Sequence, residues 1–404
     1  MFAVNFGGTS RSIMMQIVLK RGEDKRIRSG HPWVFSNEIH QVRGDKIPGS
    51  ATEVFDSEGR FIGTGFYNPN SLIAVRLLSW LHVDIDSEAF YRELIEKALR
   101  YRRSLYPGME SFRAVYSEGD FLPGLIVDKY GDYLAVQFLA LGMEIRKELI
   151  MSALLKIFAP RGIVARNDVG VRRLEGLEEK VEVLYGDPPG IIEVEEHGLR
   201  FRVDILAGQK TGHFFDQKNN HLLLKGISEG KDLLDCFCYT GSWGIHAASY
   251  GARSVTFLDV SERAINLARE NATLNGLTTP MHFEAEDAFD RLRSLKSEGR
   301  SFDLVVLDPP AFVKNRKALK EAEKGYLTIN RRAMELLREG GYLISCSCSY
   351  HMGREMFRDL LAQAAKLSGR KMRVLGSHSQ APDHPVLLAI PETEYLKCVL
   401  LQAV

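Results

Sequence analysis

The sequence contains few cysteines, and none are spaced as a metal site or a disulfide framework would require. Five occur among 404 residues, in distant places and without a CxxC spacing. Free thiols in a chain of this size are typical of the reducing cytosol. We therefore expect a cytoplasmic protein that holds no metal ion.

Excess charge and long apolar runs are also missing. The net charge is +1, so a basic surface for nucleic acid must come from local clustering. No apolar run is long enough to span a bilayer, and residues 1–13 lack the pattern of a secretion signal. We expect no membrane association, and we interpret residues 1–13 as an extension outside the fold or a misplaced start.

Residues 14–86 form the first of three blocks that the sequence separates. Short β-rich runs punctuated by Gly, Pro and Asn predict a small β-barrel. The expected strands are 17–19, 51–55, 61–67 and 72–78.

A basic cluster stands in this block just before the motif His31-Pro32-Trp33-Val34-Phe35. Cations beside an aromatic side chain suit contacts with RNA phosphates and bases. The alternative is a solvated loop with Trp33 and Phe35 in the barrel core. We favour the core for the two aromatics, and both interpretations stay open for the cluster. Its residues are Lys20, Arg21, Lys25, Arg26 and Arg28.

Residues 87–193 predict a central α+β domain. Ser87 is the expected N-cap of a helix over 87–106, and a second helix is expected over 143–158. Nothing in this block indicates a chemical site. The expected strands are 124–128, 133–138 and 162–166, with a hairpin turn at 130–133.

Residues 194–404 predict a Rossmann-like, doubly wound α/β domain. A hairpin over 194–205 is followed by apolar strands that alternate with helices, as in a parallel sheet covered on both faces. The expected strands are 232–236, 254–259, 281–285, 302–307 and 341–346.

The first of these strands leads into a loop and a helix over 242–250, where such sheets bind ligands. The loop lacks the G-x-G-x-x-G series, although Gly241 and Gly244 leave room for a ligand. A cofactor without phosphates therefore fits better than a dinucleotide.

Acidic residues end successive strands. Asp235 ends the first, Asp259 ends the second and is suited to accept from ribose hydroxyls, and Asp287 follows the third and is suited to accept from an adenine amino group. One such acid alone is usually a helix cap or a surface charge. Three in succession predict cofactor binding.

These acids, with Asp308-Pro309-Pro310, resemble those of class I S-adenosyl-L-methionine-dependent methyltransferases. More narrowly, the chain resembles the bacterial large-subunit ribosomal RNA cytosine-5 methyltransferase I family over nearly its whole length. The shared motifs are His31-Pro32-Trp33-Val34-Phe35, Glu195-Glu196-His197-Gly198, Lys210-Thr211-Gly212 with Asp216-Gln217, Cys236-Phe237 with Tyr239-Thr240-Gly241, Asp308-Pro309-Pro310 with Phe312-Val313, Ser347-Cys348-Ser349, Asp383-His384-Pro385 and Tyr395-Leu396-Lys397.

The resemblance implies methylation of carbon 5 of a cytosine in large-subunit (23S) ribosomal RNA, with S-adenosyl-L-methionine as cofactor. It makes residues 14–86 a PUA-like RNA-binding domain and 194–404 the methyltransferase domain. Its motifs place Phe237, Tyr239 and Thr240 at the cofactor. Residues expected to cover the cofactor, or simply to form the exit of the hairpin, are Lys210, Phe214 and Gln217.

The strand over 302–307 delivers Asp308 at its carboxyl end. Asp308 and the carbonyl of Pro309 are placed to accept from the exocyclic amine of a cytosine, because the two prolines fix the backbone. Pro310 and Phe312 complete the expected base pocket. The alternative, a strand-ending turn with a solvated Asp308, is weak in this context.

Carbon 5 of cytosine attacks a methyl group only after a thiolate has added to carbon 6, so the reaction needs a positioned cysteine. Cys346 and Cys348 lie two apart, so periodicity does not choose between them. Cys348 lies nearer the carboxyl edge of the sheet, and the resemblance aligns it with the family's motif cysteine. We predict Cys348 as nucleophile and Cys346 as core.

Three other functions stay open. Methylation of a base amine is disfavoured because Ala311 stands where such enzymes carry an aromatic residue. Uridine methylation at carbon 5 shares the thiol chemistry. A non-catalytic RNA-binding assembly protein is the third. The target nucleotide, the proton-abstracting base and a homodimer are also left open.

Overall fold

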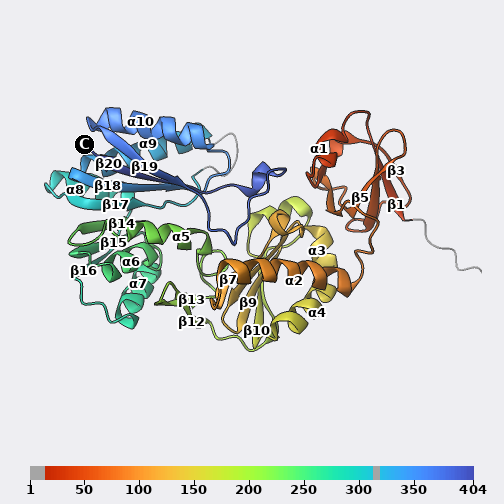
Figure 1. The fold of residues 1–404 in the computed structure, drawn as a ribbon, viewed down its shortest axis with the longest axis horizontal. Helices are drawn as coiled ribbons and strands as arrows, with labels where there is room; N and C mark the ends of the chain where they lie inside the picture. Colours follow the sequence, from red (N-terminus) through yellow and green to blue (C-terminus); the bar gives the residue numbers. More distant parts are fainter. Residues whose placement is uncertain (1–13, 313–318) are drawn as a thin grey trace, which may run out of the picture.

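The computed structural model describes residues 14–312 and 319–404. The interpretations of residues 1–13 and of Val313 lie outside these described residues. In the described part of the chain, no helix is both long and apolar enough to cross a bilayer. Figure 1 shows an N-terminal β-sheet unit, a central α+β unit and a C-terminal α/β unit in succession along the chain.

The N-terminal unit has strand order β2-β6-β5-β4-β1-β3, with β1 parallel to β4. Its core contains Ile17, Val54 and Val75, which are fully buried. This confirms the predicted β-rich unit, while β2, β3 and α1 were not predicted. The elements are β1 (Met15–Leu19), α1 (Lys25–Arg28), β2 (Trp33–Phe35), β3 (Ile39–Arg43), β4 (Ala51–Phe55), β5 (Phe61–Tyr67) and β6 (Ile73–Ser79).

The prediction that Trp33 and Phe35 lie in the barrel core is wrong. Successive side chains of a strand point to opposite faces, and in β2 the core takes Val34. Trp33 and Phe35 are half-buried on the other face. The Trp33 indole Nε1 donates to Oε1 of Glu118 at 2.9 Å, so this aromatic contacts the central unit.

The central unit has strand order β11-β10-β9-β8-β7, and α2 packs against α4 and β7. The hydroxyl of Ser87 accepts from the backbone N–H of Phe90, as expected of the N-cap. The predicted helix over 143–158 is divided at Arg146, which leaves helical geometry between α3 and α4. The elements are α2 (Glu88–Leu105), β7 (Ser111–Tyr116), β8 (Leu125–Tyr130), β9 (Tyr133–Phe138), α3 (Leu141–Ile145), α4 (Lys147–Phe158), β10 (Gly162–Arg166) and β11 (Val181–Gly186).

A hairpin of β12 (Ile191–Glu196) and β13 (Leu199–Asp204) joins this unit to the next. It begins at Ile191 rather than at Val194. His197 and Gly198 both have positive φ, as the predicted two-residue turn requires.

The C-terminal sheet has strand order β16-β15-β14-β17-β18-β20-β19, parallel except where β20 runs antiparallel to β18 and β19. Helices α6 and α7 cover one face and α8, α9 and α10 the other (Figure 1). The predicted doubly wound sheet is confirmed. Its elements are α5 (Lys218–His221), β14 (Asp232–Cys236), α6 (Ser242–Ser249), β15 (Ser254–Asp259), α7 (Glu262–Leu274), β16 (Met281–Ala285), α8 (Ala288–Ser297), β17 (Phe302–Leu307), α9 (Leu319–Glu335), β18 (Leu337–Ser347), α10 (Arg354–Ser368), β19 (Met372–His378) and β20 (Lys397–Ala403).

The segment between β19 and β20 ties the units together. Asp383 lies in it and forms a fully buried ion pair with Lys218 at 2.6 Å, and its carbonyl accepts from Arg102 of α2. Further along, Glu392 lies 3.2 Å from the imidazole of His31 in the N-terminal unit. This segment ends at Leu396, so the same stretch of chain contacts all three units and one wall of the cavity described next.

Candidate active site

A cavity of about 590 Å³ lies at the carboxyl edge of the C-terminal sheet, where loops follow β14, β15, β16, β17 and β18. Predicted residues that line it are Lys210, Phe214, Gln217, Phe237, Tyr239, Asp259, Asp287, Asp308, Pro309, Pro310, Phe312 and Cys348. Lining residues that were not predicted as site residues are Gln209, Asp216, His221, Cys238, Ser242, Trp243, Val260, Ala288, Phe289, Ala311 and Leu396.

The loop after β14 is held in an unusual backbone conformation. Phe237 has φ 62° and Tyr239 has φ 47°, in the left-handed region that costs a non-glycine residue on the order of 1 kcal/mol. The carboxylate of Asp259 accepts from the backbone N–H of Tyr239 at 3.0 Å and holds the loop in place. This conformation brings both aromatic residues to the cavity wall.

The glycines of this loop do not leave room for a ligand, which corrects the prediction for Gly241 and Gly244. A Cβ on Gly244 would lie 2.2 Å from Cε1 of Phe257, and one on Gly241 would lie 3.0 Å from the Cβ of Ala268. Both glycines therefore allow α6 to pack closely on the sheet and on α7. Gly241, with φ 87°, also begins that helix.

Asp235 and Thr240 are likewise buried beneath the cavity and, with Gly241, are not part of its wall. Asp235 accepts from the backbone N–H of Gly244 at 2.9 Å, and its burial raises its pKa well above the ordinary value. The carbonyl of Thr240 accepts from the side chain of Asn271. Side chains near the end of a strand alternate between the cavity and the core, and these lie on the core side. They therefore support the loop without contacting the cavity.

Carboxylates and an apolar surface meet at one end of the cavity. Asp259 is 9% exposed and Asp287 caps α8 by accepting from the N–H of Asp290. Val260, which is 74% exposed, and Phe289 supply the apolar part of the same wall. Hydrogen-bond acceptors beside an apolar surface suit a nucleoside, whose ribose hydroxyls and amino group donate.

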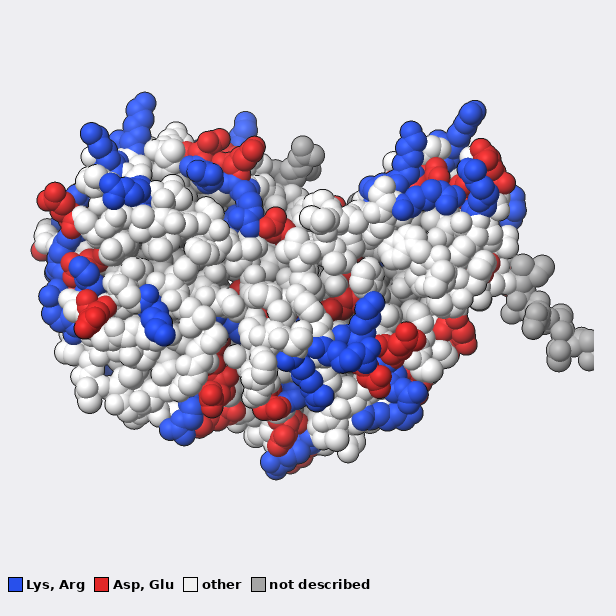
Figure 2. Space-filling view, viewed as in Figure 1, with Lys and Arg blue, Asp and Glu red and all other residues white. Residues whose placement is uncertain are grey.

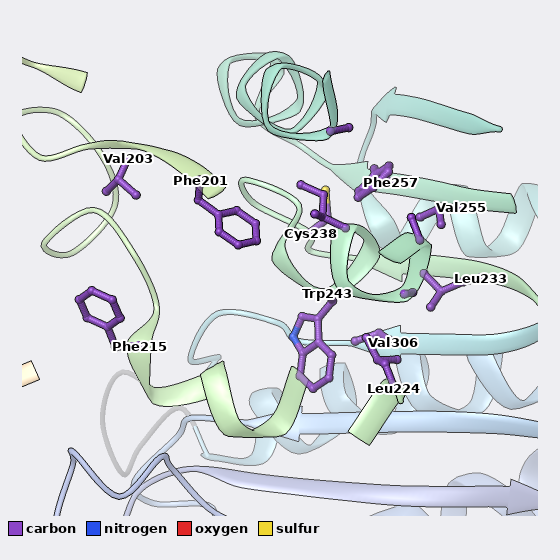
Figure 3. Close-up of a cluster of buried hydrophobic side chains, with 14 of the residues drawn as sticks. Phe201, Val203, Phe215, Leu224, Leu233, Cys238, Trp243, Val255, Phe257 and Val306 are labelled. Carbon is purple, nitrogen blue, oxygen red and sulfur yellow. The ribbon is translucent and has the colours of Figure 1, made fainter. Parts of the chain in front are cut away.

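Asp308 lies at the other end, immediately after β17. Its Oδ2 accepts from the amide of Gln217 at 3.0 Å and from the indole of Trp243 at 3.1 Å. Burial raises the pKa of Asp308 to about 6, although both donors oppose the shift. Trp243 is itself fixed in the hydrophobic cluster that contains Leu233 and Val306 (Figure 3). Asp308 is therefore a carboxyl group in a fixed orientation whose pKa is about 6.

Cys348 directly follows β18 and is half-buried at the cavity wall. Its Sγ lies 3.9 Å from the carbonyl oxygen of Pro309. Burial raises its pKa, and the nearby charge of Lys210 acts in the opposite direction. Cys346 is fully buried opposite Cys398 of β20, which confirms the prediction that it belongs to the core.

Lys210 and Asp216 line the opening beside these groups. The ammonium of Lys210 lies 3.5 Å from the carboxylate of Asp216 and 4.4 Å from the ring centre of Phe214. The hydroxyl of Tyr395 donates to the same carboxylate, and the pKa of Asp216 is lowered despite its burial. Lys210 is thus a cation held at the cavity by a buried anion.

Sequence reasoning predicted no metal site, yet one buried carboxylate lies among three imidazoles behind the cavity. Potential metal-ligand atoms of Glu196, His221 and His246 lie within 4.8 Å of one another. His221 donates from Nδ1 to Glu196 at 2.6 Å, and His213 and His246 donate to it at 2.8 and 3.1 Å. Because a carboxylate only accepts, the three imidazole N–H groups satisfy the buried Glu196.

This cluster predicts a loss of thermal stability in mild acid. Burial lowers the pKa of His221 to about 4 from 6.5, so the unfolded chain takes up a proton at a pH where the folded protein does not. We expect the Tm to fall as the pH is lowered from about 7 to about 5. The decline should be shallower in His221→Phe, and differential scanning calorimetry at several pH values measures it. Equal slopes in both proteins would contradict the assignment.

The basic cluster of the N-terminal unit is only partly free. Arg26 donates to both carboxylate oxygens of Glu38, at 2.8 and 3.0 Å, and contacts His31. Lys20 donates to the carbonyl of Asn37. Glu38 therefore holds the Arg26 guanidinium, and the contact of this residue with RNA stays a prediction.

Arg21 and Lys25 are exposed, and within residues 14–312 and 319–404 neither has an ion-pair partner within 4.0 Å. Helix α1, which carries Lys25, lies on the side of its unit that faces the C-terminal unit (Figure 1). Figure 2 shows Lys and Arg side chains gathered on this N-terminal unit, and a hollow between it and the C-terminal unit. Helix α1, which carries Lys25, one of these two free cations, thus borders this hollow.

Comparisons with known proteins match this fold. Residues 17–80 match the PUA-like domain family, and residues 165–385 match the S-adenosylmethionine-dependent methyltransferase family. A structure named as a SAM-dependent methyltransferase from Streptococcus mutans has TM-score 0.83 and 21% identity, and covers 96% of this chain and 100% of its own. A methyltransferase structure complexed with SAH has TM-score 0.84 at the same identity and coverage.

Curated relatives match over almost the whole chain under the name Ribosomal RNA large subunit methyltransferase I. The protein of Erwinia tasmaniensis is 37% identical, covering 95% of this chain and 98% of its own length. That of Tolumonas auensis is 38% identical, covering 96% and 99%. That of Vibrio cholerae is 39% identical, covering 94% and 97%. The chain belongs to the ribosomal RNA large subunit methyltransferase I family and combines a PUA-like domain with an S-adenosyl-L-methionine-dependent methyltransferase domain.

Proposed function

We propose that this enzyme methylates carbon 5 of a cytosine in large-subunit (23S) ribosomal RNA through a covalent bond between Cys348 and carbon 6. The observation that carries the proposal is the shared cavity: the Cys348 thiol lies 3.9 Å from the Pro309 carbonyl, and Asp308 lines the same wall. A nucleophile and hydrogen-bond acceptors for one base therefore face the end of the cavity opposite Asp259 and Asp287.

The cofactor would lie along that far end. Asp259 would accept from the ribose hydroxyls and Asp287 from the adenine amine, while Val260 and Phe289 would cover the ring. S-adenosyl-L-methionine, when bound, supplies the methyl group. Residues proposed to enclose it are Lys210, Phe214, Gln217, Phe237 and Tyr239, all of which line the cavity. Asp235, Thr240 and Gly241 would act by holding the loop beneath it.

The sulfur chemistry follows from the reactivity of the base. The Cys348 thiolate adds to carbon 6, and the π electron pair of the C5–C6 double bond shifts away from carbon 6 onto carbon 5, which becomes nucleophilic like the carbon of an enamine. Carbon 5 would then take the methyl group as the bond between that group and the sulfonium sulfur of the donor breaks, and the demethylated donor would leave as a neutral thioether. The proton on carbon 5 would pass to a base, the C5–C6 double bond would reform and the C6–S bond would break, which returns the thiolate. The target base must first leave any stack for its carbon 6 to reach the sulfur.

Asp308 would select the base. Its Oδ2 already accepts from Gln217 and Trp243. Among the described residues no group donates to Oδ1, so this oxygen is left to accept from a ligand. A carboxylate and the Pro309 carbonyl both accept, which suits the amino group of cytosine and disfavours the carbonyl that uracil carries there. Pro310 and Phe312 would pack against the ring.

The free cations of the N-terminal unit would bind RNA phosphates. We expect Arg21→Ala and Lys25→Ala each to weaken RNA binding at low salt and to reduce the slope of log K against log salt by about 1. Arg26→Ala is the comparison, because Glu38 occupies that guanidinium. It should change the slope less and the Tm more. Fluorescence anisotropy over a salt series measures this, and equal slopes for wild type and Lys25→Ala would contradict the proposed contact.

The direct test of the proposed reaction uses S-adenosyl-L-methionine with a labelled methyl group and ribosomal RNA from a strain that lacks the gene. Nuclease digestion and mass spectrometry should find the label in 5-methylcytidine. Label in a methylated uridine or on a base amine would replace the proposed reaction with one of the alternatives. Absence of cofactor binding in calorimetry would favour a non-catalytic RNA-binding protein.

A further inference from the structure

Lys397, the first residue of β20, is a buried cation next to the proposed nucleophile. It is 4% exposed and pairs with Ser347 across the antiparallel β18–β20 ladder. Within residues 14–312 and 319–404, no carboxylate oxygen lies within 4.0 Å of its ammonium group. Burial of an ammonium without a carboxylate partner is costly, so its position calls for a specific interaction.

The ammonium group fixes the backbone around Cys348. Its Nζ donates to the carbonyl of Ser349 at 2.6 Å and to the carbonyl of Tyr395 at 2.7 Å. Ser347 is the strand partner of Lys397 and Ser349 is its acceptor, so the lysine contacts the residues on both sides of Cys348. These two hydrogen bonds use two of the three N–H groups of the ammonium.

The charges around the thiol are mixed. Burial raises the pKa of Cys348, and Asp308 and Asp216 add to that rise, whereas Lys210 and Lys397 lower it. Lys210 is half-exposed at the cavity opening, so water screens its charge. Lys397 is enclosed by protein, so water screens its charge less, although its effect on the pKa of Cys348 is smaller than that of Lys210.

The same interaction acts on the lysine. Burial lowers the pKa of Lys397 to about 8, Arg354 also lowers it, and Cys348 and Glu394 raise it. The opposed effects of the two side chains on each other are those expected of a thiolate beside an ammonium.

We propose that Lys397 is a positioning residue for the methyl-transfer reaction: its buried ammonium group orients the backbone around Cys348 and stabilises the thiolate. This role rests on the proposed function, because stabilising the Cys348 thiolate affects the reaction only if Cys348 is the nucleophile. A purely structural lysine would stabilise the fold without changing the acidity of the thiol.

The test measures how fast iodoacetamide alkylates Cys348 as a function of pH in the folded, full-length protein. Cys348→Ala supplies the background, since the other four thiols are buried. In Lys397→Met we expect the midpoint of the profile to move to higher pH, with alkylation at neutral pH slowed roughly tenfold, which corresponds to one pKa unit. Lys397→Arg, which keeps the charge, should recover much of the rate.

The matched control is Lys371→Met, the same change at an exposed lysine just before β19, and it should leave the profile unchanged. Lys397→Gln, whose amide can still donate to a carbonyl, replaces the Met variant if that variant does not fold. An unchanged midpoint in a folded, charge-free variant would overturn the proposal.

The two proposals fail separately. If Lys397→Met shifts the alkylation midpoint but Cys348→Ala still methylates RNA, the covalent mechanism is wrong and the electrostatic coupling stands. If Cys348→Ala is inactive and the midpoint does not move, only the role of Lys397 is wrong.

Discussion

Replacing Cys348 with alanine is expected to abolish methyl transfer, lowering the rate by at least about 10⁴-fold, because the variant lacks the thiol proposed to add to carbon 6. The affinity for S-adenosyl-L-methionine should stay within about twofold of wild type, since the thiol lies at the base end of the cavity and away from Asp259 and Asp287. Single-turnover transfer of a labelled methyl group measures the rate, and isothermal titration calorimetry measures the affinity.

Cys346→Ala is the matched control. This thiol faces Cys398 in the core, so its loss removes one small buried group and should reduce stability more than activity. Loss of all activity in Cys346→Ala, with normal activity in Cys348→Ala, would exchange the roles of the two cysteines. Wild-type rates in both would exclude a thiol mechanism.

Asp308→Asn is expected to lower the rate on cytosine by about 10²- to 10³-fold, because an amide presents a donor or a weaker acceptor to the exocyclic amine. The pKa of Asp308 is about 6, so the wild-type rate should fall as the pH drops through 6 and the acceptor is protonated. The variant should lack this step. The rate constant of methyl transfer, measured in single-turnover experiments over a range of pH, shows both effects. An unchanged acid limb in Asp308→Asn would contradict the assignment.

The same substitution should stabilise the protein. The pKa of Asp308 is raised from 3.8 to about 6 by burial, so the ionised carboxylate opposes folding above pH 6. Below about pH 4 the group is protonated in both states and the penalty disappears. We therefore expect Asp308→Asn to raise the Tm at neutral pH and to lose that advantage in acid, as measured by calorimetry. A lower Tm at neutral pH would show that the carboxylate stabilises the fold.

Most of the C-terminal sheet could be predicted from the sequence because strands buried on both faces leave continuous apolar runs. Strands β14, β15, β16 and β17 have the predicted limits. The N-terminal unit was harder. β2 spans three residues and β3 carries mostly polar side chains, so neither has a strong pattern. The division of the helix at Arg146 depends on tertiary contacts of that side chain and has no local signal.

The acids at the cavity were predictable because sheet topology brings the carboxyl ends of parallel strands together. Which of them face the ligand was not. Asp235 is buried in the core while Asp259 lines the wall, because Asp235 is the last residue but one of β14 and Asp259 is the last of β15. Gly244 was predicted to leave room for a ligand, but the space beside it is filled by the ring of Phe257. These outcomes depend on how helices pack on the sheet, which spacing alone does not determine.

The supporting groups behind the cavity were missed for a related reason. Trp243 orients Asp308, and Glu196 gathers three imidazoles that are distant in the sequence. A lone tryptophan or glutamate on an apolar element has no signature of its own. The motif Glu195-Glu196-His197-Gly198 was noted in the sequence, but it does not indicate that the Glu196 carboxylate contacts three histidines.

The covalent bond itself is the most direct test of the account. Ribosomal RNA in which 5-fluorocytidine replaces cytidine carries no proton on carbon 5 that can leave, so the enzyme and RNA should remain joined after methyl transfer. Denaturing electrophoresis should show this complex only with S-adenosyl-L-methionine present, and peptide mass spectrometry should place the RNA on Cys348. Methylation of the native RNA by an enzyme that forms no such complex, or that forms it on another residue, would contradict the mechanism.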